Sequence, residues 1–135
     1  MTVPLSRSIG MDDAERPIRF PVELEQALEH IRLLAHRRHG YLVDRRSTRR
    51  AMRKAAATPD LVWNVVARLS PADFHEGPRP DHHCLQREVW IFCPAVNGRV
   101  MYLKIAFRRV PEGPESAPVI WSFHQPRFPL QRGDP

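Results

Sequence analysis

Three side chains with catalytic potential lie in the C-terminal half of the chain: the phenol of Tyr102, the ammonium of Lys104 and the imidazole of His124. Together these groups can transfer protons and neutralise the charge of a phosphate. Tyr102 and Lys104 are two positions apart, so a strand would carry both on one face. His124 is the last residue of the apolar run Val119–His124, and it alternates with Phe123 onto the same side as the polar Ser122. If the apolar faces of the two strands coincide, the three side chains converge on one polar face, which is the candidate active face.

The segment that carries these residues is typical of an antiparallel sheet. It contains three runs rich in β-branched and aromatic residues, Glu88–Cys93, Arg99–Phe107 and Val119–His124, and the first two are separated by Asn97-Gly98, a hairpin signal. In the second run one parity is apolar throughout, which predicts a core-facing side. That parity comprises Met101, Leu103, Ile105 and Phe107.

The residues before the sheet show helical periodicity. Apolar residues recur at three- and four-residue steps from Pro21 to Gly40, which predicts an amphipathic helix. We expect a second helix over 48–57 with Ser47 as its N-cap, and a third that begins at Thr58-Pro59. The polar stretch from His75 to Gln86 contains two prolines and a glycine and is predicted to be a long loop.

The chain length and composition indicate one folded domain. At 135 residues and 42% hydrophobic content, a single α+β domain over 21–130 is expected, with a flexible N-terminal tail over 1–20 and a C-terminal tail over 131–135. No uncharged run approaches the roughly 18 residues of a membrane-spanning helix, and the first residues lack the apolar core of a secretory signal. We therefore expect a cytoplasmic protein that does not bind membranes.

The charge balance favours an anionic partner. Lys and Arg outnumber Asp and Glu by 21 to 15, for a net charge of +6, and nucleic acid is the first expectation, an acidic protein the second and a membrane surface a distant third. The predicted second helix carries two rows of cations at four-residue spacing, which would either bind RNA or an acidic protein, or form an ordinary solvated face. The candidate RNA-binding residues are Arg45, Arg46, Arg49, Arg50, Arg99 and Arg108.

Imidazoles and thiols near the predicted loop raise the question of a metal site. His82, His83 and Cys84 are adjacent, so their side chains diverge, and no pair has the two-to-four-residue separation that structural zinc sites favour. We expect no metal and no other cofactor. Cys84 and Cys93 are the two cysteines of the chain, which implies no disulfide framework, and Cys93 is expected to pack in the core.

Several short motifs, in this order and spacing, resemble the MqsR family of type II toxins. They are Leu69-Ser-Pro-Ala-Asp-Phe74, Glu88-Val-Trp90, Gly98, Tyr102-Leu-Lys-Ile105 and Ser122-Phe-His124. The family consists of small bacterial ribonucleases with a RelE-like fold, in which two or three helices pack on one face of an antiparallel β-sheet. The resemblance implies a ribosome-independent endoribonuclease that cleaves mRNA and is held inactive by a cognate antitoxin, itself expected to bind DNA.

The resemblance also implies a catalytic set, from which this chain departs. Tyr102 matches the family's tyrosine and Lys104 a basic strand residue, whereas Glu76 and His124 stand where lysines are expected. Our hypothesis gives His124 the role of general acid or base and Tyr102 that of its proton-transfer partner, with Lys104 and Arg87 as electrostatic stabilisers. Because of Glu76, a non-catalytic module that binds RNA or an antitoxin remains the alternative, and the oligomeric state is left open.

Overall fold

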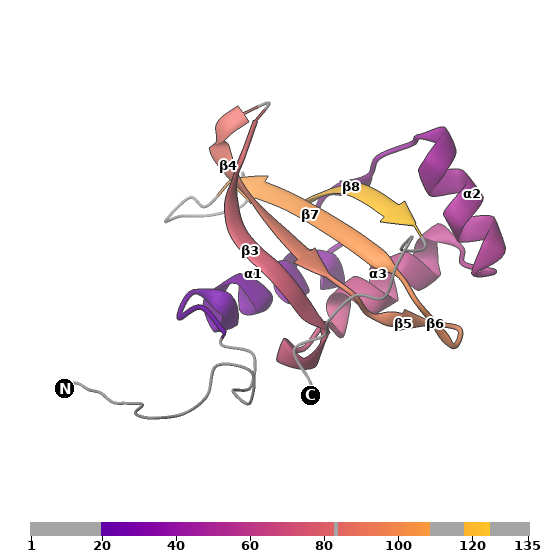
Figure 1. The fold of residues 1–135 in the computed structure, drawn as a ribbon, viewed down its shortest axis with the longest axis horizontal. Coiled ribbons are helices and arrows are strands. Elements are labelled where there is room, and N and C mark those ends of the chain that lie inside the picture. Colours follow the sequence, from indigo (N-terminus) through magenta and orange to yellow (C-terminus); the bar gives the residue numbers. More distant parts are fainter. Residues whose placement is uncertain (1–19, 83, 109–117, 125–135) are drawn as a thin grey trace, which may run out of the picture.

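The computed structural model describes residues 20–82, 84–108 and 118–124, and these residues form an α+β fold (Figure 1). The five-stranded sheet has the order β2-β8-β7-β4-β3; its pairs are antiparallel except for β2, which pairs parallel to β8. The helices are α1 Leu24–His36, α2 Arg46–Lys54 and α3 Pro59–Ala67, followed by the 3-10 turn Pro71–Asp73. The strands are β2 Tyr41–Leu42, β3 Phe74–Asp81, β4 Cys84–Phe92, β5 Ala95–Val96, β6 Arg99–Val100, β7 Tyr102–Arg108 and β8 Val119–His124.

Two of the three helices carry the predicted local features, although α1 is shorter than the predicted stretch and begins at Leu24. The predicted stripe of α1 is buried, and Thr58 caps α3 by accepting a hydrogen bond from the Leu61 N–H at 3.1 Å. Helix α2 begins at Arg46, two residues before its predicted start, so Ser47 lies in the first turn and is not the N-cap. The buried contacts of Thr48 and Met52 orient this helix, and such tertiary packing outweighs a local capping preference.

The predicted hairpin around Asn97-Gly98 is confirmed. Both residues have positive φ, 51° and 83°, as a two-residue type I′ turn requires. The turn joins the short strands β5 and β6, and β7 then pairs antiparallel with β4, with Phe92 opposite Leu103. The Asn97 side chain donates hydrogen bonds to the Ala55 and Ala56 carbonyls at 2.8 and 3.2 Å, which ties the hairpin to the end of α2.

The prediction of a loop from His75 to Gln86 is wrong, because most of these residues belong to strands β3 and β4. β3 and β4 pair as an antiparallel hairpin across this stretch. β3 lies at the edge of the sheet, where a proline costs no ladder hydrogen bond if its nitrogen points outward. Pro78 and Pro80 are therefore compatible with strand structure that the local composition alone argued against.

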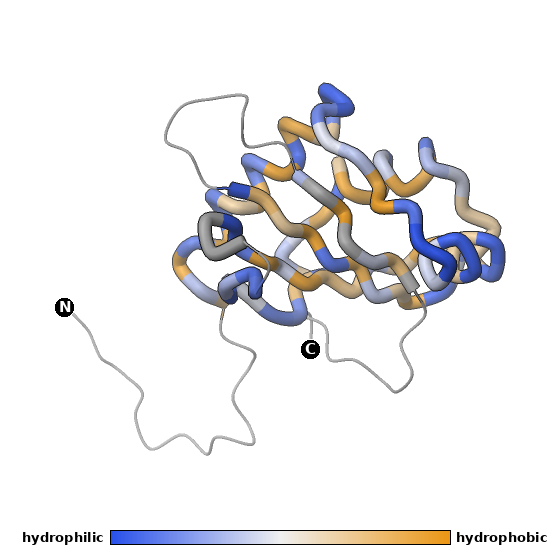
Figure 2. Tube along the Cα trace, turned by 90° about the horizontal axis from the view of Figure 1, so that it is seen from above, coloured by the Kyte–Doolittle hydropathy of each residue, from blue (hydrophilic) through white to orange (hydrophobic). Residues whose placement is uncertain are grey.

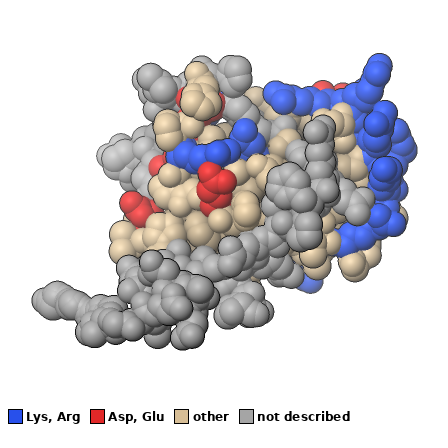
Figure 3. Space-filling model, viewed as in Figure 1, with Lys and Arg blue, Asp and Glu red and all other residues tan. Residues whose placement is uncertain are grey.

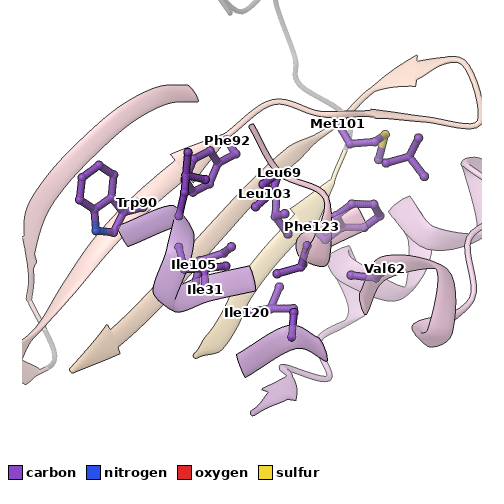
Figure 4. Packing of buried hydrophobic residues seen from close by; sticks show 14 of the residues in the cluster. Ile31, Val62, Leu69, Trp90, Phe92, Met101, Leu103, Ile105, Ile120 and Phe123 are labelled. Atoms are coloured by element: carbon purple, nitrogen blue, oxygen red, sulfur yellow. The ribbon is translucent and has the colours of Figure 1, made fainter. Parts of the chain in front are cut away.

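One core fills the layer between the helices and one face of the sheet. In Figure 1 α1 and α3 lie behind the sheet, and Figure 4 shows side chains from both layers meeting there. The members of this core that are 0% exposed include Ile31, Val62, Trp90, Phe92, Leu103, Ile105, Ile120 and Phe123. The predicted apolar parity of β7 is thus confirmed, and its neighbours on β4 and β8 bury the same face.

The other face of the sheet has its own small apolar cluster. Val89, Ile91 and Ala106 are buried there, and Val43 and Tyr102 pack against them partly exposed. Cys93 is fully buried, as expected. Among the described residues no helix is long and apolar enough to cross a membrane. Residues 1–19 of the predicted N-terminal tail (1–20), the predicted C-terminal tail over 131–135 and the connection between β7 and β8 over 109–117 lie outside the described residues.

Candidate active face

The face of the sheet turned away from α1 and α3, here called the polar face, carries the predicted catalytic positions. Tyr102 and His124 are paired directly across β7 and β8. Residues paired in this way lie on the same face of an antiparallel sheet, so the backbone register brings the two predicted positions together. Lys104 is paired with Ser122 on β8 and with Ile91 on β4, on the same face.

A β-bulge in β3 adds two charged residues to this face. Glu76 is opposite Ile91 and Arg79 opposite Val89, so three steps along β3 match two steps along β4. The extra residue brings two positions of opposite parity onto one face. At the bulge Gly77 has φ +139°, and a Cβ there would lie 2.9 Å from the Trp90 ring, so this position requires glycine.

Glu76 and Arg79 form an ion pair on the polar face. The Arg79 Nη1 donates to Glu76 Oε2 at 2.8 Å, and both side chains are a little under half exposed. Sequence reasoning missed Arg79 entirely, since it assigned this stretch to a loop, and it noted Glu76 only as a departure from the family pattern. Strict alternation along β3 would have placed the two residues on opposite faces.

The electrostatics connect this ion pair to Tyr102 and Lys104. Burial lowers the pKa of the Lys104 ammonium and the positive charge of Arg79 lowers it further, against the opposing effects of Asp81 and Glu76. Burial raises the pKa of the Tyr102 phenol, which Arg79 lowers and Glu76 raises. Glu76, Arg79, Tyr102 and Lys104 therefore lie within electrostatic range of one another, and we call them the polar-face cluster.

Arg87 lies beside the cluster but has a structural partner. Its Nε is 3.0 Å from Asp81 Oδ2, and the Asp81 side chain is fully buried while that of Arg87 is 24% exposed. Across the β4–β7 pair Arg87 faces Arg108. The guanidinium that sequence reasoning assigned to catalysis thus balances a buried carboxylate, and Arg79 supplies the positive charge next to Tyr102 and Lys104.

The predicted basic residues fall into separate places. All of the α2 cations are exposed, and Figures 2 and 3 show a hydrophilic helix and a concentration of Lys and Arg at this edge of the molecule. Arg45, at the start of α2, contributes to the lowered pKa of Lys104, so this end of the helix adjoins the cluster. Arg108 is exposed at the end of β7, whereas Arg99 is exposed on the β5–β6 hairpin.

The cluster combines the groups that acid–base chemistry on a phosphodiester needs. A carboxylate can accept a proton, a guanidinium and an ammonium can stabilise negative charge on phosphate oxygens, and a phenol can donate a proton or a hydrogen bond. Within residues 20–82, 84–108 and 118–124, no group of three His, Cys, Asp or Glu side chains is placed to hold a metal ion.

Comparisons with known proteins add no assignment: no family model, no curated protein and no solved structure matches this chain. The resemblance to MqsR toxins stays a prediction from the motifs.

Proposed function

We propose that the protein is an endoribonuclease that cleaves mRNA on the polar face of its sheet. The observation that carries the proposal is the arrangement of Glu76, Arg79, Tyr102 and Lys104 on one face, with His124 paired to Tyr102 across the neighbouring strand. Internal transesterification of RNA requires a base, an acid and positive charge at the phosphate, and this face offers a carboxylate, two candidate acids and two cations for these roles.

In the proposed reaction Glu76 accepts the proton of the ribose 2′-hydroxyl while the 2′-oxygen forms a bond to phosphorus. The bond from phosphorus to the 5′-oxygen breaks, and the leaving oxygen takes a proton from His124 or Tyr102. Arg79 and Lys104 neutralise the charge that builds on the phosphate oxygens. Because Lys104 is partly desolvated, its attraction to a bound phosphate is stronger than that of a fully hydrated ammonium. The products are a 2′,3′-cyclic phosphate and a 5′-hydroxyl end.

The biological setting we propose is that of a toxin in a type II toxin–antitoxin pair. It is supported by the motif resemblance and by the basic α2, which offers an acidic antitoxin a complementary surface beside the cluster. A cognate antitoxin that covers this region would block RNA access. In cells, induced expression is expected to arrest growth, and the alternative of a non-catalytic binding module predicts that soluble protein is harmless.

The test is cleavage of a synthetic single-stranded RNA by purified protein in the presence of EDTA. We expect fragments that end in a 2′,3′-cyclic phosphate, and no cleavage where a 2′-deoxynucleotide replaces the residue before the cut. Glu76→Gln should reduce the rate about 100-fold or more, whereas Glu29→Gln, on the exposed side of α1, should leave it unchanged. Absence of cleavage by folded wild-type protein, or equal rates for the two variants, would contradict the assignment.

A further inference from the structure

A pocket of about 480 Å³ lies between the edge strand β2, α2 and α3, and none of the residues assigned to cleavage lines it. Its lining includes Tyr41, Val43, Thr48, Arg49, Met52 and Trp63. Its volume falls in the range of small-molecule sites, and its walls are mainly apolar with a few polar groups, as such sites usually are. None of the roles in the cleavage reaction uses it.

Two aromatic side chains line the pocket. Tyr41 is 60% exposed, which is high for a large side chain, and Trp63 is partly buried against the core. Exposed aromatic rings bind the bases of single-stranded nucleic acids by stacking, with little dependence on sequence. The pocket therefore has the side chains that a flat, unpaired base would contact.

One polar group in the lining has no hydrogen-bond partner among the described residues. Thr48 is 1% exposed, and its Oγ1 makes no hydrogen bond within the described part of the chain. A buried hydroxyl normally has a hydrogen-bond partner, since leaving one unmade is costly. The hydroxyl oxygen is covered in the structure, so a base reaches it only after a small shift of the lining; a hydroxyl both donates and accepts and can then pair with the polar edge of any base.

The charge beside the pocket indicates a polyanion. Helix α2 has no acidic residue, and among its cations only Arg49, at the pocket rim, makes an ion pair in the described ranges, with Asp44. Exposed arginines at three- and four-residue spacing suit successive phosphates of a nucleic-acid backbone. The other cations of α2, and Arg45 directly before it, have no ion pair there: Arg45, Arg46, Arg50, Arg53 and Lys54.

The pocket also adjoins the polar face. Val43 lines the pocket and packs in the same small cluster as Tyr102. Arg45 lies one residue before α2 and acts electrostatically on Lys104. A single strand bound along α2 would therefore lie close to both places.

We propose that this pocket is a nucleobase-binding subsite that holds an unpaired base of single-stranded RNA while α2 binds the adjoining phosphates. That the RNA is also the substrate rests on the proposed function. The alternative occupant, an apolar side chain of an acidic protein, fits the pocket's apolar walls but leaves the Thr48 hydroxyl without a partner.

The test is binding of fluorescently labelled eight-nucleotide 2′-O-methyl RNA, which cannot be cleaved, measured by anisotropy. Tyr41→Ala and Thr48→Val should each weaken binding at least about fivefold, and Tyr41→Phe should bind like wild type. Leu33→Ala, at an exposed apolar position on α1, is the matched control and should have no effect. None of these pocket variants should change binding of an abasic oligomer with the same number of phosphates.

The basic helix is tested with the same probes. Arg46→Ala combined with Arg50→Ala should weaken binding of both oligomers. The slope of log affinity against log salt concentration should become less negative by roughly one to two. Equal binding of base-bearing RNA by wild type, Tyr41→Ala and Thr48→Val would overturn the subsite. So would a result in which binding of an acidic Trp-containing peptide depends on Tyr41 while binding of RNA does not. Glu76→Gln should bind normally, so a failure of catalysis and a failure of this subsite give different results.

Discussion

The two faces of the sheet are built from the same strands but bury different kinds of side chains. On the face toward α1 and α3, Leu103, Ile105 and Phe123 are fully buried in one core. On the polar face Tyr102 and Lys104 have their pKa values shifted by burial, in the direction that disfavours the charged form. One face thus contributes stability, and the other holds ionisable groups partly out of water, a cost typical of functional sites.

The difference teaches that alternation alone does not make the polar face functional. A solvated face would keep its lysine hydrated and its charges apart. Here the bulge in β3 adds the Glu76–Arg79 pair beside Tyr102 and Lys104, and a buried carboxylate fixes Arg87 nearby. The following changes separate what each face contributes.

The largest effect on the cleavage rate is expected from His124→Ala. Removal of a general acid or base usually costs two or more orders of magnitude in rate, so cleavage of synthetic RNA should fall about 100-fold or more. His36→Ala, on the exposed last turn of α1, serves as the matched histidine control. Unchanged turnover in the His124 variant would remove this residue from the site.

Arg87→Ala should act on stability. It leaves the buried Asp81 carboxylate without its guanidinium, and breaking such a pair costs about 3–5 kcal/mol in the free energy of unfolding. Urea denaturation measures this loss, and adding Asp81→Asn to the variant should recover part of it. A stable Arg87→Ala protein with strongly reduced cleavage would instead support the catalytic role predicted from the sequence.

Leu103→Ala tests the helix-covered face. Leu103 is fully buried in the core, and such truncations cost about 2–5 kcal/mol through lost burial and cavity formation. The midpoint of urea unfolding should fall accordingly. The cleavage rate per folded molecule should stay within about twofold of wild type, and a much larger loss would show that the two faces are coupled.

Lys104→Met should lose cleavage activity but not stability. Since burial and Arg79 lower the pKa of Lys104 below its ordinary value of 10.5, the folded protein binds this proton less well than the unfolded chain does. The charged Lys104 therefore lowers the stability of the wild-type protein. This loss is fully present below the pKa of Lys104 in the folded protein and disappears as the pH rises to 10.5. The variant's stability relative to wild type should therefore be highest near neutral pH and decline in alkaline urea titrations. A constant difference would contradict the desolvation.

Tyr102→Phe should have the smallest effect on stability, with a pH dependence opposite to that of Lys104→Met. Burial raises the pKa of the phenol above its ordinary value of 10.0, so the folded protein keeps a proton that the unfolded chain loses. This contribution to stability is present below pH 10 and is lost as the pH rises through the folded pKa. Unfolding free energies measured from pH 9 to 11 should decline for wild type and less for the variant, and parallel curves would contradict the shift.

The sequence determined much of the fold and half of the site. Helical periodicity, the Thr58 cap and the Asn97-Gly98 turn are local signals, and the alternation in β7 separated its core residues from Tyr102 and Lys104 before any strand was paired. Such patterns are readable because they depend on neighbours in the chain.

Tertiary structure alone decided the rest. Pro78 and Pro80 argued locally for a loop, and only the position of β3 at the sheet edge makes them strand residues. The bulge that adds Arg79 to the polar face breaks the two-residue period on which sequence reasoning depends. The pairing of Arg87 with Asp81 and the pocket beside α2 likewise arise from packing between segments, because their contacts depend on how helices and strands come together and not on the order of residues within one element.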